Sequence, residues 1–153
     1  LPYTILEELR EVNVGDLENM PPTLEAWETH NQVIAAWFQG DLDRRFVGGE
    51  NGLELRTRFD RALRQMLDGR EAQHVVVVGH GGQFTFALPQ LCPSVNVAEM
   101  LHRPNQNCSI STIAVQRNNG SWAGELLTWS DYAHLSGVAA ELVEGYVKTQ
   151  NRN

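Results

Sequence analysis

The sequence predicts an α/β protein, folded as a three-layer α/β/α sandwich with a mostly parallel central sheet. Helical and β-branched segments alternate along the chain, which is the element order of layered α/β domains. The run Val75–Val78 is apolar without polar alternation, as expected of a strand that helices cover on both faces. The chain has 153 residues, 42% of them hydrophobic, so we expect one domain over residues 1–153.

Two helices are predicted in the N-terminal half. Thr23 follows two prolines and caps a helix over residues 24–38, and a glycine-rich loop spans residues 40–52. The second helix ends at Gly69. It has an apolar face with helical spacing, made of Leu55, Phe59, Ala62 and Met66. A polar face is expected opposite, made of Glu54, Arg58, Arg61 and Gln65.

The C-terminal half is predicted to begin with the buried strand Val75–Val78 and a short helix over residues 83–91. Strands over 109–116 and 122–128 follow, joined by Asn118-Asn119-Gly120, a strong turn signal. Apolar residues from Ser136 onward have helical spacing, so a final helix is expected there.

The charge, the cysteines and the apolar runs of the sequence limit which partners and which cellular compartment the protein is expected to have. The net charge of −7 and the pI near 5.1 argue against non-specific binding to nucleic acid or to anionic membranes. Cys92 and Cys108 lack CxxC spacing, so neither a disulfide scaffold nor a structural zinc site is expected. With no apolar run of membrane-spanning length and no basic leader before an apolar stretch, we expect a cytoplasmic protein.

The segment Gly79-His80-Gly81-Gly82 is the strongest candidate site. It lies between the predicted strand and a helix start, where ligands bind in open α/β sheets. Glycines let a ligand approach the backbone, and the free N–H groups of a helix start attract anions. His80 can add a hydrogen-bond donor and, when protonated, a charge. The residues alone therefore favour a phosphate or carboxylate site over a structural histidine in a glycine-rich turn.

Four stretches, in order, carry a family resemblance. They are LREVNVGDLEN, GGENGLELRTRF, VVVVGHGG, and NQNCSISTIAV followed by WSDYAHL. Together they cover nearly the whole chain and resemble the motifs of the histidine phosphatase superfamily, which is phosphoglycerate mutase-like. Members of that family transfer a phosphoryl group to a catalytic histidine and then to water or another hydroxyl.

The resemblance implies roles for individual residues. His80 matches the second, phosphate-holding histidine, with Gly81 beside it on the phosphate, and Glu11 matches the general acid. Glu50 is expected to be structural, orienting a loop or pairing with an arginine. No cofactor and no metal are implied, because histidine and arginine supply the positive charge. The implied substrate is a small-molecule phosphate ester, and neither nucleic acid nor a membrane is an expected partner.

The family's Arg-His-Gly motif, which holds the nucleophile, does not occur in the sequence. We therefore expect a C-terminal portion that lacks the family's first strand and is nearly inert until an N-terminal polypeptide completes it. Three explanations of the absent N-terminal segment are open. The segment is removed or omitted, or a companion chain supplies it, or the chain is a degenerate relative with rearranged elements. The short spacing from Gly15 to Glu50 and the His80-Gly81-Gly82 form favour a phosphatase. Mutase-type transfer, a non-catalytic phospho-ligand binder and a homo-oligomer stay open.

Overall fold

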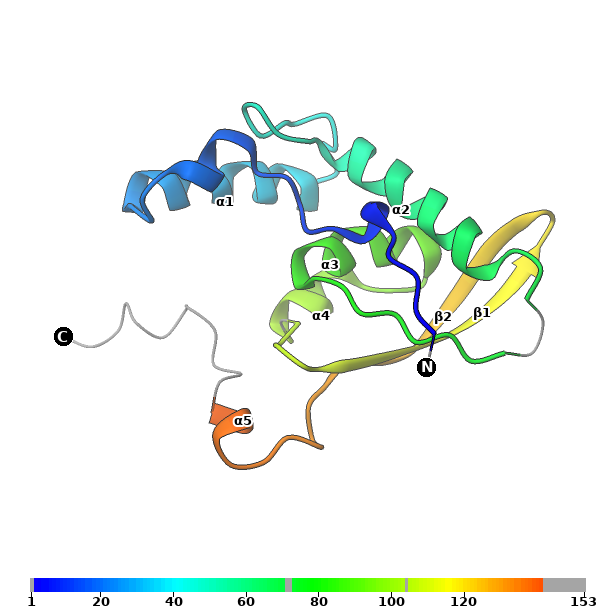
Figure 1. Cartoon of the computed structure of the whole chain (residues 1–153). Helices are drawn as coiled ribbons and strands as arrows, with labels where there is room; N and C mark the ends of the chain where they lie inside the picture. The colour runs from blue at the N-terminus through cyan, green and yellow to red at the C-terminus, as the bar shows by residue number, and fades with distance from the viewer. Residues whose placement is uncertain (1, 71–72, 104, 142–153) are drawn as a thin grey trace. The chain divides into compact units, whose positions relative to one another are not determined.

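The computed structural model describes residues 2–70, 73–103 and 105–141 (Figure 1). The chain divides into two compact units, Leu1–Ala87 and Leu88–Asn153, each considered by itself. Helices and strands are both present, so the fold is α/β in composition. Within the described residues, no helix is both long and apolar enough to cross a membrane.

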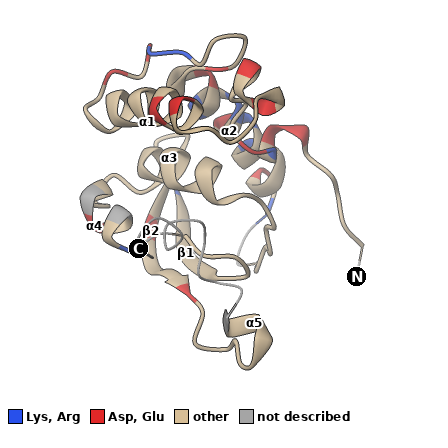
Figure 2. Ribbon diagram, turned by 90° about the vertical axis from the view of Figure 1, so that its left-hand side faces the viewer, with Lys and Arg blue, Asp and Glu red and all other residues tan. Residues whose placement is uncertain are grey.

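The first unit is helical. Two 3-10 turns, η1 (Glu7–Leu9) and η2 (Gly15–Asn19), precede helix α1 (Leu24–Phe38), and helix α2 (Gly52–Leu67) follows a loop. Helix α3 (Gly81–Leu91) begins in this unit, and η1 packs against α2. Acidic residues are spread over the turns and helices of this unit (Figure 2).

Both predicted N-terminal helices are confirmed. Each begins after a capping residue that can be recognised in the sequence. Helix α1 has the predicted bounds, and the Thr23 hydroxyl accepts a hydrogen bond from Ala26 N at 3.2 Å. Helix α2 starts earlier than its apolar pattern, at Gly52. Asn51 and Glu54 form a reciprocal capping box that satisfies the N–H groups of the first turn.

A small apolar core holds the first unit together. Its buried members come from the segment after η1, from α1, from the following loop and from α2: Val12, Val33, Trp37, Phe46 and Leu55. Phe86 of α3 packs edge-on against Trp37, with ring centroids 5.2 Å apart. This core ties the segment that carries Glu11 to the start of α3.

The prediction of a buried parallel strand at Val75–Val78 is wrong for the described residues. This segment forms neither strand nor helix, and Val76 and Val78 are 90% and 88% exposed. A strand forms only when a neighbouring strand pairs with its backbone N–H and C=O groups. No described segment pairs with these four valines, so the predicted parallel sheet is not seen in the part of the chain that the structure covers.

The second unit contains an antiparallel hairpin of β1 (Ile110–Asn118) and β2 (Ser121–Asp131), with helix α4 (Val97–His102) before it. The predicted turn is confirmed: Asn119 and Gly120 have φ of 48° and 84°, as a tight hairpin turn requires. The Trp129 indole donates to Arg103 O at 2.7 Å and fixes the end of β2. Of the final helix predicted from Ser136, the described part is α5 (Val138–Glu141); the remainder falls outside the described residues.

Candidate active site

The segment around Glu11 is held by one buried arginine. Arg58 of α2 is 2% exposed and donates to the carbonyl oxygens of Glu8, Arg10 and Glu11 at 2.6, 2.8 and 3.0 Å. A planar guanidinium with five donors can hold several acceptors in fixed directions. The expectation that Arg58 belongs to a solvent-facing polar face is therefore wrong, because its side chain points into the unit and fastens the Glu11 segment.

The charge of Arg58 is balanced by Glu50. The two side chains form two hydrogen bonds, at 2.7 and 3.0 Å, and Glu50 is 5% exposed. Glu50 also accepts from Asn13 N at 2.8 Å. Of the two structural roles predicted for Glu50, pairing with an arginine is confirmed. A buried ion pair of this kind is tolerated because additional hydrogen bonds satisfy its remaining groups.

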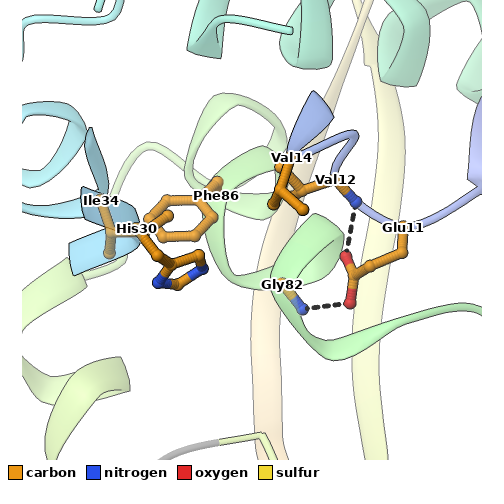
Figure 3. Close-up of a pocket in the computed structure, with 7 residues that line it drawn as sticks. All are labelled: Glu11, Val12, Val14, His30, Ile34, Gly82 and Phe86. Atoms are coloured by element: carbon orange, nitrogen blue, oxygen red, sulfur yellow. Dashed lines mark hydrogen bonds between the residues drawn. The ribbon is translucent and has the colours of Figure 1, made fainter. Parts of the chain in front are cut away.

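The Glu11 carboxylate lies at the first turn of α3. Gly82 N donates to Oε2 at 3.1 Å and Val12 N donates to Oε1 at 2.8 Å (Figure 3). Gln83 N also donates to Oε1, at 2.7 Å. The free N–H groups and the positive end of the helix dipole favour a carboxylate at this place. These contacts connect residues 71 and 72 positions apart in the sequence and fix the direction of the carboxylate.

The Gln83 side chain reinforces this arrangement from inside the unit. It is fully buried, and its amide donates to Glu8 O at 2.7 Å. A Cβ added at Gly82 would lie 2.8 Å from Glu11 Oε1, so the carboxylate would have to move from its present position. The glycine-rich segment thus permits a close approach, as predicted, but the group that approaches Gly82 and Gln83 is the protein's own Glu11.

His80 immediately precedes this helix start. Its carbonyl oxygen accepts from Phe84 N at 3.1 Å in the first turn, and the residue is exposed. Gly81 is the first residue of α3 and is half-buried. The structure therefore brings Glu11 to the residues that directly follow His80. The roles of His80, Gly81 and Glu11 toward phosphate remain predictions.

A small pocket opens beside the Glu11 carboxylate. It has a volume of about 210 Å³ and is lined by Glu11, Val12, Val14, His30, Ile34, Gly82 and Phe86 (Figure 3). His30 comes from α1 and lies across the pocket from Glu11. Its ring contacts those of Trp27 and Phe46, at centroid distances of 5.5 and 5.6 Å.

From the sequence, His30 is only a weak candidate for a substrate pocket, because it shares no metal-ligand spacing with the other histidines. The available signal was its helical position: His30 lies four residues after Ala26 and three before Val33, both buried on α1. Among the described residues, no group of three or more His, Cys, Asp or Glu side chains is placed to hold a metal ion.

Comparisons with known proteins support the family resemblance. The model of the histidine phosphatase superfamily (branch 1) matches residues 1–129. A metal-independent phosphoserine phosphatase of Arabidopsis thaliana is 26% identical over 132 residues, which are 86% of this chain and 51% of that protein. A probable phosphoglycerate mutase, GpmB, of Proteus mirabilis is 30% identical over 143 residues, 89% of this chain and 63% of that protein.

The chain thus spans between about half and two thirds of the length of these two relatives. No solved structure gives a significant match to the chain.

Proposed function

Because the chain belongs to the histidine phosphatase superfamily, branch 1, we propose that it is part of a phosphatase that hydrolyses phosphate monoesters through a phosphohistidine. The observation that supports this most is that the Glu11 carboxylate accepts hydrogen bonds from Gly82 N and Gln83 N, which closely follow His80 in the sequence. A proton-transferring group and a donor for an anion are needed side by side in such a reaction.

In the proposed reaction, His80 and the Gly81 backbone hold the phosphoryl oxygens. A nucleophilic histidine forms the P–N bond as the ester P–O bond breaks, and Glu11 gives its proton to the leaving oxygen. Water then attacks phosphorus, Glu11 takes the water proton, and the P–N bond breaks to release phosphate. Positioning and charge stabilisation supply most of the rate in such transfers, and no metal is invoked.

The nucleophile is the part of this proposal that residues 1–153 do not contain, since no Arg-His-Gly occurs there. We place it on polypeptide outside these residues, either covalently attached or as a companion chain. The same polypeptide would supply a strand to pair with Val75–Val78, whose backbone and apolar side chains are open to solvent. That pairing would complete the central sheet of a three-layer α/β/α sandwich.

The test is to trap the covalent intermediate. A longer polypeptide that includes the flanking sequence is mixed with a phosphate ester carrying labelled phosphorus and quenched in alkali, and the label is sought on protein. We expect label that is stable in alkali and lost in acid, as phosphohistidine is. Residues 1–153 alone serve as the control and should stay unlabelled. Label on serine or cysteine, or turnover without any labelled protein, would contradict the proposal.

Mutase-type transfer is the second candidate, because one of the two relatives is named as a probable phosphoglycerate mutase. The same labelled enzyme distinguishes the two activities. A phosphatase releases the label as inorganic phosphate in plain buffer, whereas a mutase retains it until an acceptor hydroxyl compound is added.

A further inference from the structure

The pocket beside Glu11 is mostly apolar. Val12, Val14, Ile34 and Phe86 supply its walls, and the two polar side chains, Glu11 and His30, face each other across it (Figure 3). Among the residues that the structure describes, neither lysine nor arginine lines it, and all seven lining residues belong to the first unit. A ligand group that enters this space therefore meets hydrocarbon together with one carboxylate and one imidazole.

The volume of the pocket limits the size of such a group. At about 210 Å³ it falls below the range of drug-sized ligand sites, which is roughly 300–1,000 Å³. Apolar protein cavities of about 150 Å³ accept benzene. A single six-membered ring, or a branched alkyl group of similar size, therefore fits.

The charges also select against an acidic group. A carboxylate on the ligand would lie beside the Glu11 carboxylate and against the valine and isoleucine walls, without a basic lysine or arginine partner in the pocket. Burying an unpaired anion against hydrocarbon walls is costly. The Nδ1 of His30 pairs with Asn31 Oδ1 at 3.1 Å, which leaves only Nε2 of this ring for a ligand group.

We propose that this pocket holds the alcohol part of the phosphate ester and selects an uncharged, phenol-sized alcohol over a carboxylate-bearing one. The inference rests on the proposed phosphatase activity for its kinetic consequences. It differs from what the names of the two relatives suggest, since phosphoserine and phosphoglycerate both carry a carboxylate. Because Glu11 lines the pocket, the leaving oxygen of a bound ester lies next to the proposed acid.

The first experiment compares kcat/KM for phenyl phosphate and 3-carboxyphenyl phosphate in the longer polypeptide. We expect phenyl phosphate to be favoured by about tenfold or more, since even a lost methylene contact in an apolar site costs roughly 10–200-fold. Ile34→Lys supplies the absent cation and should shift the ratio toward the carboxylated ester, whereas Ile34→Asp should shift it the other way. Intrinsic reactivity of the two esters cancels when variants are compared.

Leu24→Lys is the matched control, because Leu24 lies on the same helix and is 66% exposed. It should leave the substrate ratio unchanged. Should the Ile34 variants fail to fold, as judged by thermal melting, His30→Arg places a cation on the opposite wall and should favour the carboxylated ester. An unchanged ratio in a folded variant, or equal use of both esters by the wild type, would overturn the pocket assignment while leaving the phosphatase proposal intact.

A binding measurement covers the case in which neither ester is hydrolysed. That result would overturn the phosphatase proposal but not the pocket, which is then tested with phenol and 3-hydroxybenzoate titrated into the isotope-labelled chain. We expect phenol to shift the amide signals of Val12, Val14 and Gly82, and 3-hydroxybenzoate to need at least about tenfold higher concentration. Equal shifts by both compounds, or none by phenol, would refute the pocket assignment.

Discussion

Arg58 and Glu50 form a buried, doubly hydrogen-bonded ion pair, and the same guanidinium holds the backbone of the segment that carries Glu11. Helix α2 therefore holds the backbone of the candidate acid, while N–H groups at the start of α3 hold its carboxylate. The ion pair of Arg58 and Glu50 thus links the folding stability of the first unit to the position of the Glu11 segment.

Arg58→Ala should destabilise the chain by about 3–5 kcal/mol, because it leaves the buried Glu50 carboxylate with only the half-exposed Arg10 guanidinium, 3.8 Å away. Arg58→Lys should recover little, since an ammonium cannot reproduce the forked contacts. Urea denaturation measures both. Arg64→Ala breaks the exposed pair with Asp60 and, as a control, should cost less than about 1 kcal/mol. Equal effects of the Arg58 and Arg64 substitutions to alanine would contradict a structural role for Arg58.

Gly82→Ala should displace the Glu11 carboxylate, because the added Cβ would stand 2.8 Å from Oε1. In the longer polypeptide we expect kcat to fall by about 10²–10⁴, the usual contribution of a positioned general acid. Circular dichroism should show an intact fold. Glu11→Gln should produce a loss of similar size, and combining the two changes should add little. Full additivity would mean that Gly82 acts independently of Glu11.

The start of α2 should weaken in acid. A hydrogen bond from Arg45, followed by the N–H of Asn51, lowers the pKa of Glu54 below its ordinary value of 4.5. A carboxyl group with a lowered pKa in the folded state stabilises above the unfolded pKa, and this is lost as pH falls through the folded pKa. The melting temperature of the wild type should therefore drop more between pH 6 and pH 3 than that of Glu54→Gln. Glu28→Gln, an exposed site on α1, should behave like the wild type.

The two cysteines should differ in reactivity. Burial raises the pKa of the Cys92 thiol, which is inaccessible to solvent, whereas Cys108 is exposed. Because the thiolate is the reactive form, a disulfide reagent at pH 8 should modify Cys108 quickly and Cys92 only after unfolding. Mass spectrometry of the labelled peptides identifies the site, and Cys108→Ser should remove the fast phase. Rapid labelling of Cys92 in the folded chain would contradict its burial.

Local sequence rules predicted the elements whose signals lie within a few residues of each other. Helix α1 has its cap in Thr23, and the hairpin has its turn in Asn119 and Gly120. These features need no distant partner, so propensity and turn chemistry were sufficient. Val75–Val78 shows the opposite case: its composition is that of a strand, but a strand also needs a neighbour to pair with.

The candidate site was predicted only in part for a related reason. His80 was found from its glycine-rich segment before a helix start and Glu11 from the order of motifs, whereas the helical pattern of α2 gave no sign that Arg58 turns inward. Arg58 is buried because it donates hydrogen bonds to backbone carbonyl oxygens about 50 residues earlier in the sequence. The helical periodicity of α2 carries no information about such distant acceptors. The meeting of Glu11 with Gly82 spans 71 residues and is likewise a product of tertiary packing.

The most direct test of the account is the kinetics of His80→Ala in the longer polypeptide, with an aryl phosphate as substrate and a metal chelator present. We predict that kcat/KM falls about 10²–10³-fold, the cost of removing a donor from a developing anion. The chelator should leave the wild-type rate unchanged, and His74→Ala, an exposed histidine six residues earlier, should retain full activity. A loss of less than about twofold on replacing His80 would contradict its assignment as the phosphate-holding residue.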